Sequence, residues 1–134
     1  MQCLMSGTRL RILIDTSVLI FAALEPSRLT RKAFSILADS ETTPEISIVS
    51  IAEIALKNAT GKLVFPAIDV RHSMDDLEIR LLPFTADHAF RLFDLPLHHR
   101  DPFDRQIIAQ SLHEKIPLIT SDQKFSLYGG EILW

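Results

Sequence analysis

Four acidic residues stand at positions from which they could form one metal site: Asp15, Glu53, Asp104 and Asp122. Asp15 closes a short apolar run of β-favouring residues, and Asp122 follows another such run. Glu53 and Asp104 fall in the first turns of two predicted helices. Carboxylates brought this close repel one another, so a divalent cation should lie between them, and oxygen ligands suit Mg²⁺ or Mn²⁺. Such a cation polarises a phosphoryl oxygen and generates hydroxide from bound water, which predicts phosphodiester hydrolysis.

Each acid also has a purely structural interpretation. Glu53 follows Ser50 by three residues, which is the spacing of a capping box. Asp104 would stand near a helix N-terminus, where any acid gains from the helix dipole. Asp122 could cap a short turn. Asp15 is the hardest to explain structurally, because an acid at the end of an apolar strand is poorly placed for solubility. The set of four is therefore more specific than any member.

Polar side chains near these acids could support the site or contact a phosphate: Thr16, Ser17, Lys57, Arg100, Asp101, Arg105, Thr120 and Ser121. The hydroxyls could equally cap turns, and Lys57 could simply pair with Glu53 one helical turn away. Arg100 and Arg105 could bind a phosphate or form salt bridges with neighbouring acids. Asp101 could cap a helix or help to position the site.

Two adjacent histidines, His98 and His99, precede these residues in a basic loop. Adjacent side chains point in different directions, so the two cannot act as a metal-ligand pair like residues four apart on a helix. We predict that both lie in a solvated loop, and phosphate contact is the less favoured alternative.

The elements that must position the acids alternate along the chain. Apolar runs predict strands over 12–14, 46–49, 81–84, 117–119 and 132–134, and helical spacing and caps predict helices over 16–24, 27–38, 50–61, 68–77, 85–93 and 102–112. Such alternation predicts an α/β domain in which a parallel sheet has helices on both faces. Ligands in such domains bind beyond the carboxyl ends of the strands, which is where these acids fall.

Composition limits the remaining classes. The chain has 134 residues, 47% of them hydrophobic, with a net charge of −3, which predicts one folded domain over 1–134 with a loose lead-in over 1–10. A single cysteine excludes a disulfide framework, and four glycines without a glycine-rich loop exclude a P-loop or dinucleotide site. The longest apolar run, 18–24, is too short for a membrane span, so we expect no membrane association. No secretory signal is evident, which predicts a cytoplasmic protein.

Several of these motifs together resemble the PIN-domain ribonucleases, and within them the VapC-type toxins of prokaryotic toxin–antitoxin pairs. The resemblance rests on Ile-Leu-Ile-Asp-Thr-Ser at 12–17, Glu-Ile-Ala-Leu-Lys at 53–57, Gly-Lys-Leu at 61–63, Leu-Pro-Leu-His-His-Arg-Asp-Pro-Phe-Asp-Arg at 95–105, Ile-Ile-Ala-Gln at 107–110 and Leu-Ile-Thr-Ser-Asp at 118–122. It extends from about residue 11 to the C-terminal segment. Asn-Ala-Thr at 58–60 departs from the longer side chains that the family leads us to expect there.

The resemblance implies a PIN-like three-layer fold with the sheet order 3-2-1-4-5. It also implies that Asp15 and Asp104 bind Mg²⁺ or Mn²⁺ directly, and that Glu53 and Asp122 bind through water or complete the site. The implied substrate is RNA, and the implied partners are a second copy of the chain and a cognate antitoxin. The antitoxin would occupy a groove on the early helices, which carry an excess of apolar bulk at Val18, Leu19, Phe21, Leu24, Leu29 and Phe34.

Three other classes compete with a nuclease. A non-catalytic PIN-fold module could bind RNA or protein without cleaving. A phosphate-receiver domain also collects acids around Mg²⁺, but it needs a paired acid near the first strand and a late lysine after a strand. Here Asp15 is unpaired and Lys124 follows no clear strand. A phosphatase with an Asp-x-Asp nucleophile is disfavoured because Ser17 takes the place of the second acid.

Overall fold

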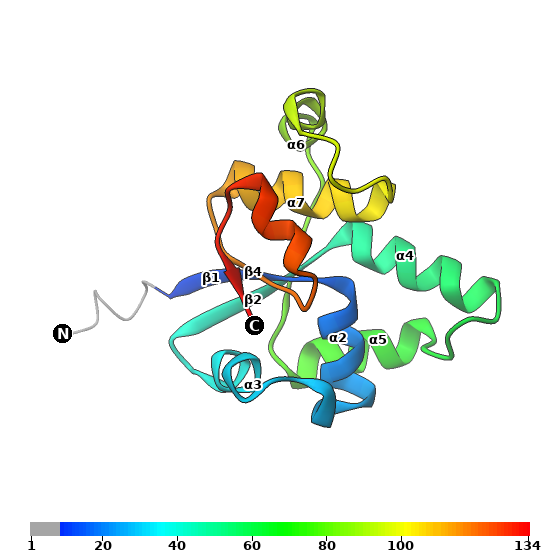
Figure 1. Ribbon diagram of the computed structural model, residues 1–134. Coiled ribbons are helices and arrows are strands. Elements are labelled where there is room, and N and C mark those ends of the chain that lie inside the picture. Colours follow the sequence, from blue (N-terminus) through cyan, green and yellow to red (C-terminus); the bar gives the residue numbers. More distant parts are fainter. Residues whose placement is uncertain (1–8) are drawn as a thin grey trace.

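The computed structural model describes residues 9–134, whose strands form one parallel sheet in the order β3-β2-β1-β4-β5 (Figure 1). The strands are β1 (Leu10–Ile14), β2 (Thr42–Ser47), β3 (Arg80–Leu82), β4 (Leu118–Ile119) and β5 (Ile132–Leu133). The predicted fold class and strand order are therefore confirmed. Most of the predicted lead-in, residues 1–8, lies outside the described residues, and Leu10 already pairs with Thr42 in the sheet.

Helices lie on both faces of the sheet, with α2 and α3 on one side of it and α6 and α7 on the other (Figure 1). The α-helices are α2 (Thr16–Leu24), α3 (Arg31–Ala38), α4 (Ile48–Ala59), α5 (Ala67–Asp76), α6 (Ala86–Arg91) and α7 (Pro102–Glu114). Short 3₁₀ helices are η1 (Pro26–Arg28), η2 (Leu92–Asp94) and η3 (Gln123–Tyr128). Within residues 9–134, no helix combines the length and the hydropathy that a membrane span requires.

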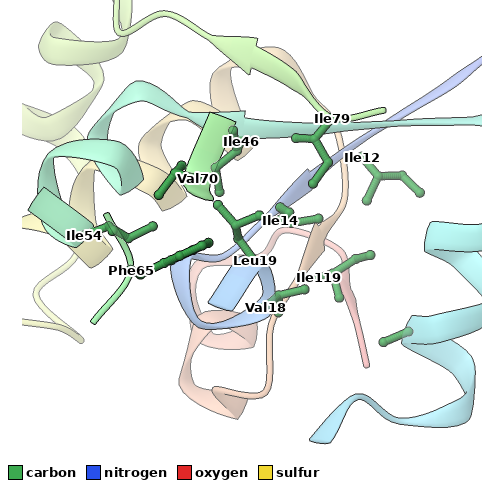
Figure 2. Close-up of a cluster of buried hydrophobic side chains, with 11 residues drawn as sticks. Ile12, Ile14, Val18, Leu19, Ile46, Ile54, Phe65, Val70, Ile79 and Ile119 are labelled. Atoms are coloured by element: carbon green, nitrogen blue, oxygen red, sulfur yellow. The ribbon is translucent and has the colours of Figure 1, made fainter. Parts of the chain in front are cut away.

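The core on the α2 side of the sheet is drawn in Figure 2. Its buried members are Ile12, Ile14, Val18, Leu19, Ala33, Ile46, Ile54, Phe65, Val70, Ile79 and Ile119. Ile12 and Ile14 of β1 point into this core, as the two-residue period of a strand requires. Each such side chain contributes about 1.5–3 kcal/mol when it is fully buried, so this core fixes which face of each strand is inward.

A second core lies on the α7 side of the sheet. Leu13 of β1 and Leu118 of β4 point into it, between the residues that face the first core. Ile107 and Ile108 of α7 and Phe125 of η3 pack against these strands. Apolar packing therefore attaches to the sheet the two segments that carry Asp104 and Asp122.

The junction between β2 and α4 differs from the prediction. The strand expected over 46–49 ends at Ser47, whose Oγ accepts the backbone N–H of Val49 at 3.0 Å and so caps α4. Ser50 lies inside the helix and is fully buried. The capping box predicted between Ser50 and Glu53 is therefore wrong, because the N-cap lies three residues earlier than expected.

Two other boundaries also differ. Pro44 lies within β2 rather than before it, and the sheet tolerates it because β3 begins to pair only at Glu45. The helix predicted over 27–38 begins at residue 31, since the Thr30 hydroxyl accepts the Ala33 N–H at 3.0 Å and starts the helix there.

Three phenylalanines placed on predicted helices lie at the surface. Phe34, one of the six apolar residues noted above on the early helices, is 57% exposed. Phe90 and Phe93 are 69% and 84% exposed and stack on each other with ring centroids 6.1 Å apart. His88 takes the inward position of α6 instead, and it is fully buried. Helical periodicity thus placed both helices, but it did not show which of their aromatic residues lie inward.

A polar network connects β1, β2 and α7 at the end of the sheet opposite the acids. Arg11 donates from Nε and Nη2 to the buried carboxylate of Glu45, at 2.6 and 2.9 Å, and its Nη1 lies 3.0 Å from Glu114. Glu114 also lies 2.9 Å from His88 Nε2. The hydrogen bond to His88 is the main cause that holds the pKa of Glu114 below its usual range.

We expect Arg11→Gln to lower the free energy of unfolding by about 2 kcal/mol, because it leaves the Glu45 carboxylate buried without its charged partner. Arg11 itself is partly exposed, so the effect stays below that of a fully buried pair. Chemical denaturation measures this change. The control is Arg31→Gln on exposed α3, which should change stability by a few tenths of a kcal/mol at most. Equal effects of the two substitutions would contradict a stabilising network.

Candidate metal centre at the carboxyl edge of the sheet

Asp15 lies at the end of β1, where it also caps α2. Its Oδ1 accepts the backbone N–H of Thr16 at 2.7 Å, and its Oδ2 accepts the Thr120 hydroxyl at 2.8 Å. Ser17 Oγ lies 3.4 Å from the same Oδ2. Burial raises the pKa of Asp15, and these hydrogen bonds oppose the shift without cancelling it. The structure thus holds a carboxylate in a buried position where neutralisation by a cation would be favourable.

Thr120 and Thr16 support this position from both sides. The fully buried Thr120 hydroxyl donates to Asp15 and accepts the backbone N–H of Asp122 at 3.1 Å. Thr16 Oγ1 lies 2.7 Å from the hydroxyl of Ser50 inside α4. The hydroxyl of Thr16 thus connects α2 to α4, and the hydroxyl of Thr120 connects the end of β4 to the end of β1.

Asp104 lies in the first turn of α7, and the N-cap of that helix is Asp101. Asp101 Oδ1 accepts the backbone N–H of Phe103 at 2.8 Å, so the capping role that we left open for Asp101 is confirmed. Burial raises the pKa of Asp104 to about 7, with further contributions from the charges of Asp101, Asp15 and Glu53. The acids are therefore close enough to repel one another.

Glu53 points inward from the second turn of α4. Its Oε2 lies 3.2 Å from Lys57 Nζ, so the predicted pair between these residues is present. Its Oε1 is buried and has no hydrogen-bond partner among the described residues. A buried carboxylate oxygen without a partner costs at least ~1–3 kcal/mol, and such an atom beside Asp15 and Asp104 is what a bound cation would satisfy.

Asp122 completes the group from the loop after β4. Its Oδ1 accepts the backbone N–H of Lys124 at 2.9 Å and caps η3, and its Oδ2 lies 2.8 Å from His99 Nε2. Burial acts to raise the pKa of Asp122, but the His99 hydrogen bond and the Lys124 N–H outweigh it, so the pKa lies below its usual range. Asp122 therefore stays ionised where Asp104 titrates near neutrality.

One ligand atom each from His99, Asp104 and Asp122 lies within 4.8 Å of the others, a spacing that suits one metal ion. The charges of Asp15 and Glu53 also act on Asp104. The structure therefore brings all four predicted acids to the carboxyl edge of the sheet, and we call them the acidic cluster (Asp15, Glu53, Asp104 and Asp122). The unpartnered oxygen of Glu53 and the repulsion at Asp104 both fit a divalent cation.

The predicted phosphate contacts have different placements. Arg100 and Ser121 are exposed and available to a ligand. Arg105 is not paired with either neighbouring acid among the described residues. Its guanidinium donates to the backbone carbonyl oxygens of Pro96 at 2.9 Å and Leu95 at 3.1 Å. Arg105 thus holds the loop before α7, which neither of our two sequence interpretations anticipated.

Sequence reasoning missed His99 and Tyr128. The prediction of a solvated loop is wrong for His99, which is 7% exposed and bonded through both ring nitrogens. Tyr128 lies in η3, and its hydroxyl is 2.8 Å from His99 Nδ1. The only sequence signal was the position of His99 five residues before Asp104, and periodicity carries no information on loop burial.

The raised pKa of Asp104 predicts a pH dependence for the metal-free protein. An unfolded aspartate has a pKa of about 3.9. Between about pH 3.9 and about pH 7, Asp104 therefore binds more protons in the folded state than in the unfolded state. Stability should therefore fall as pH rises through this window. We expect Asp104→Asn to flatten the curve of melting temperature against pH, measured in chelator. Asp94→Asn, on exposed η2, is the control, and parallel curves for all three proteins would contradict the assignment.

A parallel sheet of this order, with an acidic cluster at its carboxyl edge, defines a small class of α/β domains. Residues 12–131 match the family profile described as PIN domain, and the chain therefore belongs to the PIN domain family. Among curated proteins, no sequence relative reaches significant similarity to this chain.

Several solved structures have the same fold, and those described as toxins or toxin–antitoxin complexes are among them. VapBC2 from Rickettsia felis, bound to promoter DNA, aligns with a TM-score of 0.67 at 15% identity over 92% of this chain and 97% of that one. FitAcB from Neisseria gonorrhoeae aligns with a TM-score of 0.59 at 21% identity, covering 90% and 95%. VapC20 of Mycobacterium tuberculosis, described as a toxin that cleaves the sarcin–ricin loop, gives 0.59 at 20%, covering 89% and 95%. These likenesses show the fold.

Proposed function

We propose that the chain is a single-domain, metal-dependent endoribonuclease of the cytoplasm and the toxin of a toxin–antitoxin pair. The observation that carries the proposal is the buried, unpartnered Oε1 of Glu53 beside acids that repel one another. A domain that binds no cation there would gain nothing from such repulsion. The structural likeness to a toxin that cleaves an RNA loop supports RNA as the substrate.

The acidic cluster would hold Mg²⁺, or Mn²⁺ in its place. Asp15 and Asp104 would bind the cation directly, and Glu53 and Asp122 would bind through water or complete the coordination. A cation so bound polarises the scissile phosphate and supplies hydroxide at neutral pH. Thr120 and Ser17 would keep the Asp15 carboxylate oriented through the hydrogen bonds described above.

Exposed basic side chains would bind the RNA backbone next to the acidic cluster. Arg100 lies one residue before the cap of α7 and is exposed, so an RNA phosphate could reach it. A guanidinium can bind a phosphate through two parallel hydrogen bonds. Lys57 is 40% exposed and already shares Glu53 with the site. We expect Arg100→Ala to weaken RNA binding without changing metal affinity, because it touches none of the acids among the described residues.

Metal binding tests the proposal directly. Mn²⁺ at 100-fold excess over its Kd should stabilise the folded state by about 2.7 kcal/mol, read as a rise in melting temperature. Asp104→Asn should remove both the rise and metal-dependent cleavage of RNA, whereas Asp94→Asn should keep both. A protein that shows no shift with millimolar Mn²⁺ or Ca²⁺ would contradict a metal site. A shift without cleavage would favour the alternative of a non-catalytic RNA- or protein-binding module.

We further propose an antitoxin partner, which the toxin–antitoxin complexes among the structural neighbours support. The apolar surface on the early helices is smaller than the sequence led us to expect. Val18 and Leu19 are fully buried, whereas Leu24 and Phe34 are 45% and 57% exposed. These two exposed residues would contact the antitoxin, and Phe34→Glu should break co-purification of the pair without loss of cleavage.

A homodimer is the remaining partner proposal. A hollow of about 490 Å³ opens between α4 and α5 and is lined mainly by apolar side chains. Leu81 of β3 is among the residues that line it and is exposed, as is Ile68 of α5. Light scattering on the purified chain would give the mass of a dimer, and Leu81→Glu should convert it to the mass of a monomer.

A further inference from the structure

His99 is a buried residue of the loop before α7, and its side chain contacts η3. Its ring stacks on Phe125 with centroids 4.5 Å apart and an interplanar angle of 19°. One ring nitrogen, Nδ1, is 2.8 Å from the Tyr128 hydroxyl, and the other, Nε2, is 2.8 Å from Oδ2 of Asp122. Both polar atoms of this buried side chain therefore have partners, and its orientation is fixed on three sides.

The chemistry of the partners gives the contacts a direction. The ionised carboxylate of Asp122 can only accept, so the proton on this contact belongs to His99 Nε2. In the neutral ring Nδ1 is then an acceptor, and it accepts a hydrogen bond from the Tyr128 hydroxyl. Asp122 thus selects the tautomer of His99, and Tyr128 supplies the donor that this tautomer needs at Nδ1.

His99 lies within metal-binding distance of Asp104 and Asp122, but both of its nitrogens are already used. To bind a cation, it would have to give up its bond to Asp122 or to Tyr128. The geometry therefore favours a role behind the carboxylate over a role as a ligand, in the way that partners behind metal ligands commonly orient them.

The backbone under His99 is held as firmly as the ring. Arg105 Nη1 donates to the carbonyl oxygen of His99 at 3.3 Å and to that of Pro96 at 2.9 Å. Arg105 directly follows Asp104 on α7, so one turn of helix positions both an acid of the cluster and the loop that carries His99. Displacement of this loop would disturb Asp104 and Asp122 together.

Asp122 needs this support more than the other acids do. Its side chain is 37% exposed, whereas that of Glu53 is 13% exposed and Asp15 is buried. A carboxylate on an exposed loop samples several rotamers in water, and the hydrogen bond from His99 removes that freedom on the Oδ2 side.

We propose that His99 and Tyr128 are positioning residues of the metal centre, which hold the Asp122 carboxylate in the orientation that completes cation binding. This inference rests on the proposed function of the acidic cluster. Neither residue touches the cation or the scissile phosphate. Their effect reaches the cation only through Asp122.

Two substitutions at His99 separate its two contacts. Asparagine places an amide near the position of Nδ1, so it can keep the bond with Tyr128 but cannot reach Asp122. Glutamine places its amide N–H near the position of Nε2, so it can still donate to Asp122. Tyr128→Phe removes one hydroxyl and keeps the aromatic ring beside His99 and Phe125.

The experiment measures Mn²⁺ affinity by calorimetry and by the electron spin resonance of free Mn²⁺, on proteins whose folding is checked by thermal unfolding. Loss of a partner behind a metal ligand lowers affinity by about 10–100-fold, and we expect this range for His99→Asn. His99→Gln should stay within about threefold of the wild type, and Tyr128→Phe should fall between the two. His72→Asn, on exposed α5, is the control for an ordinary histidine.

Each outcome decides the inference. Weak binding by His99→Asn with near-normal binding by His99→Gln supports positioning through Nε2. Wild-type affinity in His99→Asn and Tyr128→Phe overturns it and leaves the proposed function standing. Equal losses in both His99 variants, with Tyr128→Phe unchanged, assign the ring to packing or to direct coordination of the cation, and also overturn the inference. A wild-type protein that binds no Mn²⁺ overturns the proposed function, and the inference falls with it.

Discussion

Glu53→Gln should leave the protein folded and lower metal-dependent RNA cleavage by on the order of 10² or more, which is about 2.7 kcal/mol of transition-state stabilisation. The substitution keeps the size of the side chain and removes its charge. An amide oxygen binds Mg²⁺ far less well than a carboxylate, so the site loses a ligand charge. Melting curves and cleavage rates on the same preparation measure both effects.

The structure sharpens this test, because Ser47 rather than Ser50 caps α4 and Glu53 therefore has no capping role to lose. Its Oε1 has no hydrogen-bond partner within residues 9–134, and neutralisation at this site relieves repulsion with Asp15 and Asp104. The metal-free variant should thus melt at or slightly above the temperature of the wild type. Glu25→Gln, at the exposed end of α2, is the matched control. A folded variant that cleaves at nearly the wild-type rate would remove Glu53 from the site.

Thr120→Val is the second substitution for which we expect a large effect. Valine has the shape of threonine, but it cannot donate to Asp15 Oδ2 or accept the N–H of Asp122. The Asp122 N–H is then left without this acceptor, and Asp15 Oδ2 keeps only the longer contact with Ser17, which should cost about 2 kcal/mol of stability. Cleavage should fall by about 10–100-fold, because the partner that orients Asp15 is lost.

Thr120→Ser provides the control for this prediction, since it keeps the hydroxyl and loses only a methyl group. It should retain cleavage within a few-fold of the wild type while losing some packing energy. Denaturant melts and cleavage rates again give the two quantities. If the serine and valine variants lost activity equally, the methyl group rather than the hydroxyl would be the important part of Thr120.

The fold and the acidic cluster were predictable because they depend on local signals. Ile12–Ile14 is apolar throughout, as a strand buried on both faces must be, and Asp15 marks its end. The Asp101–Pro102 pair predicts the start of α7, and Asp101 is the N-cap of that helix in the structure. Parallel topology then gathers these ends at one edge without further information.

The errors come from choices that tertiary contacts decide. Ser47 and Ser50 are equally good caps in sequence, and only the length of pairing between β2 and β3 selects Ser47. His99 lies in a loop, where burial depends on the distant residues Phe125 and Tyr128. Arg105 has acids nearby in sequence, yet its guanidinium donates to backbone carbonyl oxygens of the loop. Contacts of this kind leave no periodic pattern in the sequence from which they could be predicted.

The hydrogen bond from Thr120 to Asp15 joins residues that are 105 positions apart. Contacts of such separation form late in folding, because a long loop must close before they contribute. During synthesis the hydrogen bond to Asp15 therefore cannot form until almost the whole chain has left the ribosome. A polypeptide that ends before β4 has Asp15, Glu53 and Asp104 but neither Asp122 nor the hydroxyl that orients the first acid. Under the proposed function, such incomplete products of translation should not cleave RNA when they are expressed alone.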